Sequence, residues 1–142
     1  MNEANWTDCL DSFSATKRTP DKYKARSLIT TAQGRLDYLK TSTLNKNNAV
    51  YIFEGIYTSI IEFIHSLTIL EGYKIINHLC LGYYLRDILK NQELFRIFND
   101  CRIKRNSLIY YGKTMDFETC RKDISKSQYL INKLKDIIKS KI

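Results

Sequence analysis

The sequence predicts an all-α protein, an up-and-down bundle of four to five helices in a single domain. Apolar residues recur every three or four positions along most of the 142 residues, which is the spacing of one face of an α-helix. One proline and five glycines leave few residues that would interrupt long helices. No segment alternates apolar and polar residues as a half-buried strand would. We therefore expect long helices joined by short turns.

The N-terminal part is expected to hold a short docked segment and one long helix. In residues 1–18, Trp6, Leu10 and Phe13 follow one another at helical spacing, which favours a short docked helix over a free tail. Thr19 followed by Pro20 is a good helix start, with a hydroxyl cap and a proline at the first helical position. This helix should end in the polar connector 41–48, whose last asparagine would cap the next helix.

The second long helix, about residues 49–70, is the most apolar. On a helical wheel it has a broad apolar arc, formed by Phe53, Ile56, Ile60, Ile64 and Leu67. Glu54, Thr58, Glu62 and His65 line up on the other side. This polar row is either a solvated face or a face from which Glu54 or Glu62 approaches Arg105 across a groove.

Three further features divide the rest of the chain into helices. Gly72 should end the second long helix, and residues 73–90 should form a third helix. A fourth helix is expected over residues 92–111, with Gly112 as a left-handed cap. Asp116 should cap the last helix, whose apolar face repeats at steps of four and three.

Charge and cysteine content set the expected surroundings. A net charge of +8 favours polyanionic partners, meaning nucleic acid or other phosphates. Residues 17–26 and 121–142 are the most basic segments, and each is either a solvated helix face or a footprint for a phosphate backbone. The four cysteines lie far apart without a CxxC pair: Cys9, Cys80, Cys101 and Cys120. With no signal-peptide pattern, we expect reduced core thiols in a cytoplasmic protein.

Several classes of protein are excluded by pattern. The long apolar segment at 49–70 contains Glu54, Glu62 and His65, so we expect no membrane span. The sequence has no phosphate-binding glycine loop, dinucleotide fingerprint or nucleophile elbow. We expect no cofactor and no metal, because two histidines are too few for a cluster and the cysteines lack ligand spacing.

One arginine breaks its own local pattern. Leu94, Phe98 and Cys101 set an apolar rhythm in the fourth helix, and the next position in that rhythm is Arg105. A buried arginine must be paired or must face a cleft, because an unpaired buried charge is costly. Arg105 is therefore either a structural ion-pair partner of a glutamate or part of a binding site.

The residues around Arg105 suit a phosphate or RNA ligand. An arginine fork matches phosphate geometry, and Arg102 and Lys104 add positive charge nearby. The amide of Asn106 and the phenols of Tyr110 and Tyr111 can bond a sugar hydroxyl or stack on unpaired bases.

Five segments of this chain occur in the same order as the motifs of a known superfamily. One of them is Arg105-Asn106-Ser107-Leu108-Ile109-Tyr110-Tyr111-Gly112, and there are four others. They are Pro20-Asp21 with Lys24-Ala25, Gly72-Tyr73-Lys74, Asn77-His78, and the helix from Asp116 onward. Together they resemble the HEPN superfamily of small helical domains over roughly residues 6 to 138. The mark of that superfamily is Arg-Asn, a few residues, then His, near the end of the penultimate long helix.

The resemblance implies a homodimer in which two Arg-Asn elements meet in one basic cleft. Many HEPN proteins are metal-independent ribonucleases, often toxins paired with a minimal nucleotidyltransferase antitoxin. By resemblance, Arg105 would hold the scissile phosphate with Asn106 beside it. The place of the proton-moving histidine holds Tyr110 or Tyr111, and only about one phenol in a thousand is in the base form at neutral pH. His78 lies in a family-like segment from which it could reach the cleft.

Two functions are therefore expected from sequence. The first is a HEPN-like homodimer that binds RNA or nucleotide phosphates around Arg105-Asn106 and is an atypical ribonuclease of a toxin–antitoxin or defence system. In this reading Tyr110 and Tyr111 complete the catalytic set, and Glu54, Glu62 and His78 are cleft partners. The alternative is a catalytically silent interaction module that partners a minimal nucleotidyltransferase or another protein.

Overall fold

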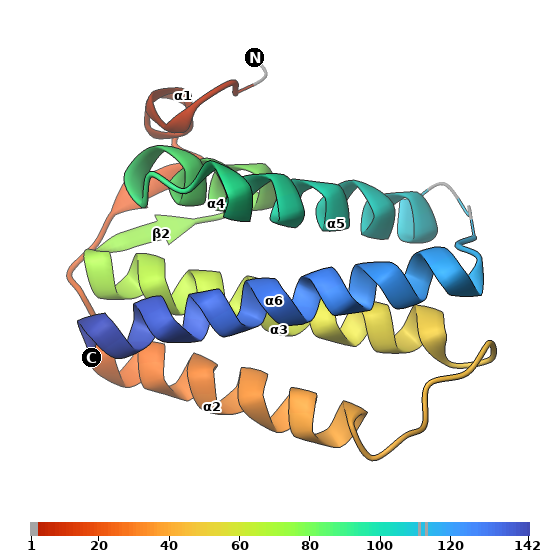
Figure 1. Cartoon of the computed structure of the whole chain (residues 1–142). Coiled ribbons are helices and arrows are strands. Elements are labelled where there is room, and N and C mark those ends of the chain that lie inside the picture. The colour runs from red at the N-terminus through yellow and green to blue at the C-terminus, as the bar shows by residue number, and fades with distance from the viewer. Residues whose placement is uncertain (1–2, 111, 113) are drawn as a thin grey trace.

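The computed structural model describes residues 3–110, 112 and 114–142, and it confirms a mostly helical fold (Figure 1). Four long helices run back and forth along the molecule: α2 (Lys22–Leu39), α3 (Ala49–Glu71), α5 (Gln92–Tyr110) and α6 (Phe117–Lys141). The prediction of an all-α bundle is therefore confirmed. No described helix is both long enough and apolar enough to cross a membrane.

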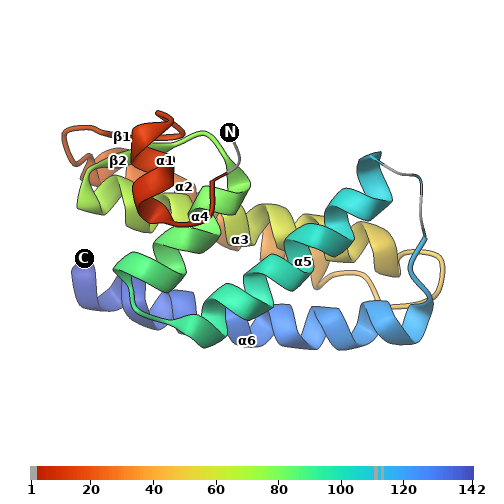
Figure 2. The same ribbon diagram turned by 90° about the horizontal axis from the view of Figure 1, so that it is seen from above.

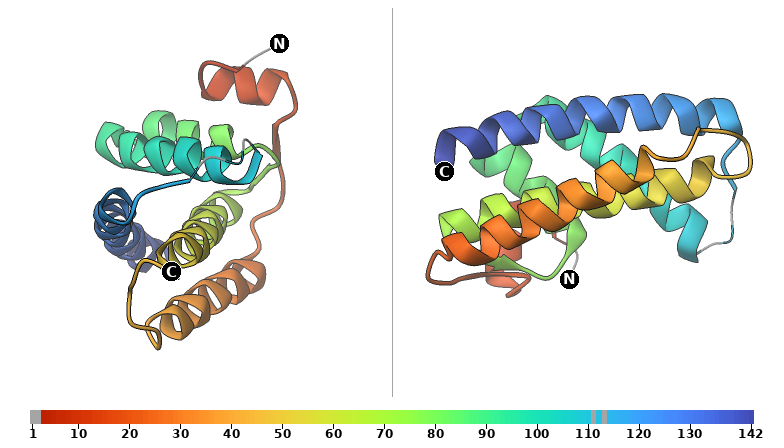
Figure 3. Two further views of the ribbon diagram at one scale, coloured as in Figure 1. Left: turned by 90° about the vertical axis from the view of Figure 1, so that its right-hand side faces the viewer. Right: turned by 90° about the horizontal axis from the view of Figure 1, so that it is seen from below.

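Helix α3 is the centre of the bundle. It packs against α2 on one side and α6 on another, and α4 (His78–Tyr83) and α5 also contact it. The view along the helices shows this layering, with α2 and α5 on opposite sides of α3 (Figure 3). All members of the predicted apolar arc are buried: Phe53, Ile56, Ile60, Ile64 and Leu67. They belong to the apolar core, to which the other elements of the fold also contribute.

Two short strands correct the expectation of a strand-free chain. Strand β1 (Ala15–Lys17) pairs antiparallel with β2 (Tyr73–Ile75), with Ala15 opposite Ile75. Each strand has only three residues, which is too short for an alternating pattern to stand out from the sequence. The predicted helix 73–90 was therefore wrong at its start and is divided into β2, α4 and a π-helix, η1 (Tyr84–Ile88).

The helix starts match the sequence only in part. Helix α2 begins at Lys22, and Asp21 rather than Thr19 is its cap, accepting a hydrogen bond from the Lys24 backbone N–H. Asp116 caps α6 as predicted, since its carboxylate accepts from the Thr119 N–H. Gly112 is left-handed with a φ of +64°, in agreement with its expected place just past the fourth helix.

Gly72 ends α3 and brings two distant segments together. Its φ of +97° is left-handed, and a Cβ at this position would lie 2.7 Å from the carbonyl oxygen of Arg18. The Arg18 N–H donates a hydrogen bond to the Gly72 carbonyl at 2.9 Å. A glycine is thus needed here for the chain before α2 to pass close to the end of α3.

The N-terminal helix α1 (Trp6–Asp11) is docked, and a disulfide between Cys9 and Cys80 ties it to α4. The prediction of four core thiols was wrong for these two residues, while Cys101 and Cys120 are buried free thiols. The backbone N–H of buried Trp6 also donates to the Asp87 carboxylate at 2.9 Å. The expectation of a cytoplasmic protein rested on four reduced thiols. The Cys9–Cys80 disulfide removes that support.

Candidate functional site

Helix α5 passes obliquely over α3 (Figure 2), and Arg105 of α5 lies over the ring of Tyr57 of α3. Its guanidinium carbon is 5.5 Å from the centroid of the Tyr57 ring, which is a cation–π distance. Tyr57 is buried and stacks on Phe98 with ring centroids 6.0 Å apart. Arg105 is half-buried, so an aromatic face covers part of its charge. The prediction that Arg105 faces inward is correct to that extent.

No carboxylate of the described residues lies within ion-pair distance of Arg105. Glu62, one of the two glutamates considered as its partner, instead forms an ion pair with Arg35 of α2. The alternative in which Glu62 reaches Arg105 was therefore wrong. Glu54 is half-buried on α3 and is in none of the ion pairs that the described part of the chain forms.

His78 is brought to this cluster from the first position of α4. Its Nδ1 lies 3.1 Å from the Tyr57 hydroxyl, and the two rings are 5.9 Å apart. Burial lowers the pKa of His78, and the charges of Arg105 and Arg102 lower it further. The imidazole is therefore neutral at neutral pH, and Nε2 has a free lone pair whenever Nδ1–H donates to Tyr57.

Tyr57 itself is a hydrogen-bonding group rather than an acid. Burial raises the pKa of Tyr57 above its ordinary value, although the positive charges of Arg105 and Arg102 act in the opposite direction. The phenol therefore stays protonated at any physiological pH. It can orient the His78 ring, and its ring face can hold the Arg105 guanidinium in place.

The neighbouring cations differ in their pairing. The Arg102 guanidinium donates two hydrogen bonds to the Asn99 side-chain oxygen, at 3.1 and 2.9 Å, and keeps its charge uncompensated by a described carboxylate. Lys104 contacts both oxygens of buried Asp123, at 2.9 and 2.8 Å, and also Asp100. Lys104 therefore forms an ion pair between α5 and α6, and these carboxylates neutralise its charge. Contrary to the prediction from sequence, its charge is therefore not free to bind a phosphate.

The other predicted site residues stand at the edge of the cluster. Asn106 is half-buried on the turn that follows Arg105. Tyr110 is 66% exposed and extends toward solvent at the end of α5. Tyr111, the other candidate for the histidine position, lies outside the residues that the structure describes.

Two residues of this region were not singled out from sequence. Tyr57 belongs to the apolar side of α3, and nothing in its spacing indicates a cation above its ring. Asp123 could have been found, because it lies three residues after Cys120 and four before Ser127, on the buried face of α6. It breaks the pattern of its helix in the same way that Arg105 breaks that of α5.

No protein-family model matches the chain, and comparisons with curated proteins and with solved structures found no similar protein. The candidate site is therefore the cluster of Tyr57, His78, Arg102, Arg105 and Asn106, called the Arg105 cluster below.

Proposed function

We propose that this chain is a HEPN-like homodimer that binds RNA through phosphate contacts of Arg105, with Arg102 and Asn106 beside it. The observation that carries the proposal is the half-buried Arg105 guanidinium, which lies over Tyr57 without a carboxylate partner among the described residues. A partly desolvated cation without a counter-ion is costly for a fold to maintain. A phosphate group would supply that counter-ion, and a guanidinium can bind it with two parallel hydrogen bonds.

The exposed apolar residues of α5 support self-association at this site. Ile103, Ile109 and Tyr110 are 51%, 44% and 66% exposed, and all lie in the half of α5 that holds Arg105. The resemblance to HEPN proteins implies that a second copy of the chain covers this region. Such a dimer would present two sets of cations to one RNA backbone, in a toxin–antitoxin or defence system with a nucleotidyltransferase as candidate partner.

The position of His78 favours cleavage as a second activity at the same site. Neutral His78 would take the proton from a ribose 2′-hydroxyl, whose oxygen then attacks the adjacent phosphorus. The bond from phosphorus to the 5′-oxygen breaks, and that oxygen takes a proton from water. The products are a 2′,3′-cyclic phosphate and a 5′-hydroxyl, and Arg105 would stabilise the charge on the phosphate oxygens during the step.

The test of RNA binding compares two arginines of α5. Arg105→Ala should weaken binding of a labelled single-stranded RNA by about tenfold or more while the helical content and the dimer are retained. The salt dependence of the binding constant should also fall, by about 0.7 in log–log slope for each phosphate that the variant no longer neutralises. Arg96→Ala is the matched control, because Arg96 is an exposed arginine of the same helix and should change affinity little.

The interaction-module reading makes the opposite prediction. If Arg105→Ala unfolds the protein, or abolishes the dimer and leaves RNA affinity of the remaining protein unchanged, Arg105 is structural and the RNA proposal is wrong. Arg105→Lys provides a second comparison, because it keeps the charge over Tyr57 but loses the fork. It should retain the fold and bind RNA more weakly than the unmodified protein.

Cleavage is tested separately from binding. The purified protein is incubated with total RNA in the presence of EDTA, and the products are analysed for cyclic phosphate ends. We expect His78→Gln to abolish cleavage and to keep RNA binding within about threefold, because a neutral side chain replaces a neutral imidazole. If the unmodified protein binds RNA in a salt-dependent way but leaves it intact, the proposed cleavage is wrong and only the binding function remains.

A further inference from the structure

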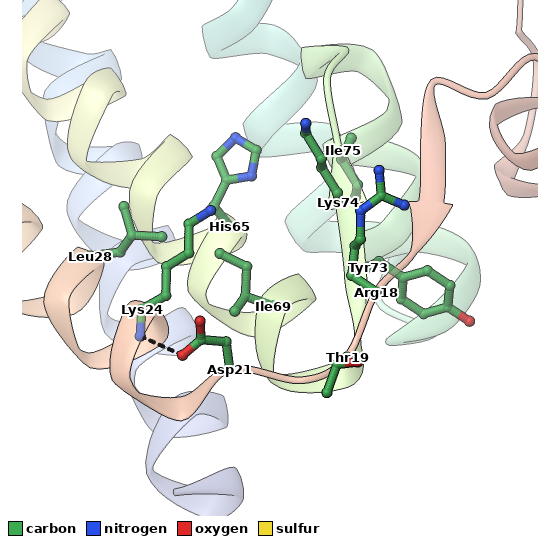
Figure 4. A pocket seen from close by; sticks show the side chains of 10 residues that line it. All are labelled: Arg18, Thr19, Asp21, Lys24, Leu28, His65, Ile69, Tyr73, Lys74 and Ile75. Atoms are coloured by element: carbon green, nitrogen blue, oxygen red, sulfur yellow. Dashed lines mark hydrogen bonds between the residues drawn. The ribbon is translucent and has the colours of Figure 1, made fainter.

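A second group of cations lines a pocket near the C-terminal end of α3 (Figure 4). The pocket has a volume of about 510 Å³, which is within the range of small-molecule sites. Arg18 follows β1, Lys24 belongs to the first turns of α2, and Lys74 is in β2. Three separate segments of the chain therefore bring a positive side chain to the same cavity, beside His65 of α3.

The charge of this pocket is not balanced from within. Its one carboxylate, Asp21, already accepts the capping hydrogen bond from the Lys24 N–H at 3.0 Å. Among the described residues, none of the carboxylates forms an ion pair with Arg18, Lys24 or Lys74. Like charges gathered around a cavity repel one another, and a bound anion removes that repulsion.

His65 adds a neutral hydrogen-bonding group to the pocket. Burial lowers the pKa of His65 to about 4, and the charges of His78 and Lys24 act in the same direction. At neutral pH the uncharged ring can donate to a ligand oxygen without adding to the repulsion between the cations.

Part of the remaining lining is apolar, which indicates a ligand larger than an inorganic ion. Leu28 and Ile69 line the pocket, and Ile69 lies between Lys24 on one side and Arg18 with Lys74 on the other (Figure 4). Small-molecule sites commonly combine such an apolar surface with a few polar groups that fix orientation. We infer that this pocket binds a small phosphorylated molecule of mononucleotide size, with its phosphate among Arg18, Lys24 and Lys74.

This site is separate from the Arg105 cluster and does not depend on the proposed RNA function. His65 and Tyr57 are eight residues apart on α3, which is about 12 Å along the helix axis. The pocket has no residue in common with the Arg105 cluster, since it is lined by α2, α3, β2 and the segment before α2. Each site can therefore be disrupted without touching the other.

The test measures binding of AMP, inorganic phosphate and adenosine to the full chain by calorimetry. AMP should bind saturably, phosphate more weakly, and adenosine not measurably, because the cations recognise the phosphate. The double variant Lys24→Ala/Lys74→Ala should weaken AMP binding by about tenfold or more. The matched control is Arg26→Ala/Arg96→Ala, which removes two exposed cations outside the pocket and should leave AMP binding unchanged.

Two results would overturn the inference. One is the absence of saturable AMP binding at millimolar concentrations, and the other is an equal loss in the control variant, which would indicate only general charge attraction. Arg105→Ala separates this inference from the RNA proposal, because that variant should lose RNA binding and keep AMP binding. If AMP does not bind but RNA binding depends on Lys24 and Lys74, the pocket is part of an RNA-binding surface. In that case the inference is wrong.

Discussion

The ion pair between Lys104 and Asp123 gives the sharpest test of the energetics of this fold. The Asp123 side chain is 2% exposed and the Lys104 side chain 30%, so the carboxylate is the more desolvated partner. Burial alone would lower the pKa of Lys104, but its hydrogen bonds to Asp123 and Asp100 outweigh that effect and raise it. The substitution Lys104→Met keeps the aliphatic stem and leaves Asp123 without its cation.

The size of the expected loss follows from the burial of the carboxylate. Removing one partner of a buried ion pair typically destabilises a protein by about 3–5 kcal/mol. Because the Lys104 side chain is itself 30% exposed, we expect a loss at the lower end of that range, about 3 kcal/mol at pH 7.

Urea unfolding at pH 7 measures this loss. Lys126→Met is the control, because Lys126 is exposed on α6 and its loss should change stability by no more than about 0.5 kcal/mol. Adding Asp123→Asn to Lys104→Met removes the buried charge and should restore more than half of the loss. A loss below about 1 kcal/mol at pH 7 would refute this reasoning.

Three further predictions concern stability. Reducing the Cys9–Cys80 bond, whose residues are 71 apart in sequence, should lower the free energy of unfolding by about 4 kcal/mol in urea titrations, and a Cys9→Ala variant should no longer respond to reductant. Because the pKa of His65 is lowered to about 4, the unfolded chain binds a proton before the folded chain does. The free energy of unfolding should thus fall by about 3 kcal/mol as the pH is lowered from 6.5 to 4. In urea titrations across this pH range, His65→Gln should remove most of that fall, and an unchanged fall would show that another group causes it. Gly72→Ala should cost about 2 kcal/mol in thermal unfolding, since its φ is +97°, whereas Gly34→Ala, in open space on α2, should be neutral or stabilising.

The sequence predicted those parts of the fold that depend on neighbours along the chain. The apolar repeat of α3, the glycine that ends it and the Asp116 cap of α6 are all local features, and all three predictions were correct. The helix expected over 73–90 was wrong, because a pairing with distant β1 decides the conformation of residues 73–75. A long-range partner overrode the local pattern at that point.

Pairing between distant side chains was the part that sequence could not supply. Nothing local distinguishes Glu54 from Glu62. Of these two glutamates, only Glu62 forms an ion pair among the described residues, and its partner is Arg35. The approach of His78 to Tyr57 depends on how α4 sits against α3. By contrast, the Arg18 and Lys24 side of the pocket lies in a segment whose excess of positive charge was visible from the start.

The Cys9–Cys80 bond closes residues 9–80 into a covalent ring, with a linear segment of chain on each side of it. The ring includes every residue that lines the basic pocket, together with Tyr57 and His78, while the C-terminal arm, residues 81–142, carries α5 and α6. Cutting the exposed connector between α2 and α3 would not release a fragment until the bond is reduced. The Arg105 cluster, by contrast, is assembled across the junction of ring and arm, so a tilt of α5 would separate Arg105 from Tyr57 and His78 while the pocket stayed intact.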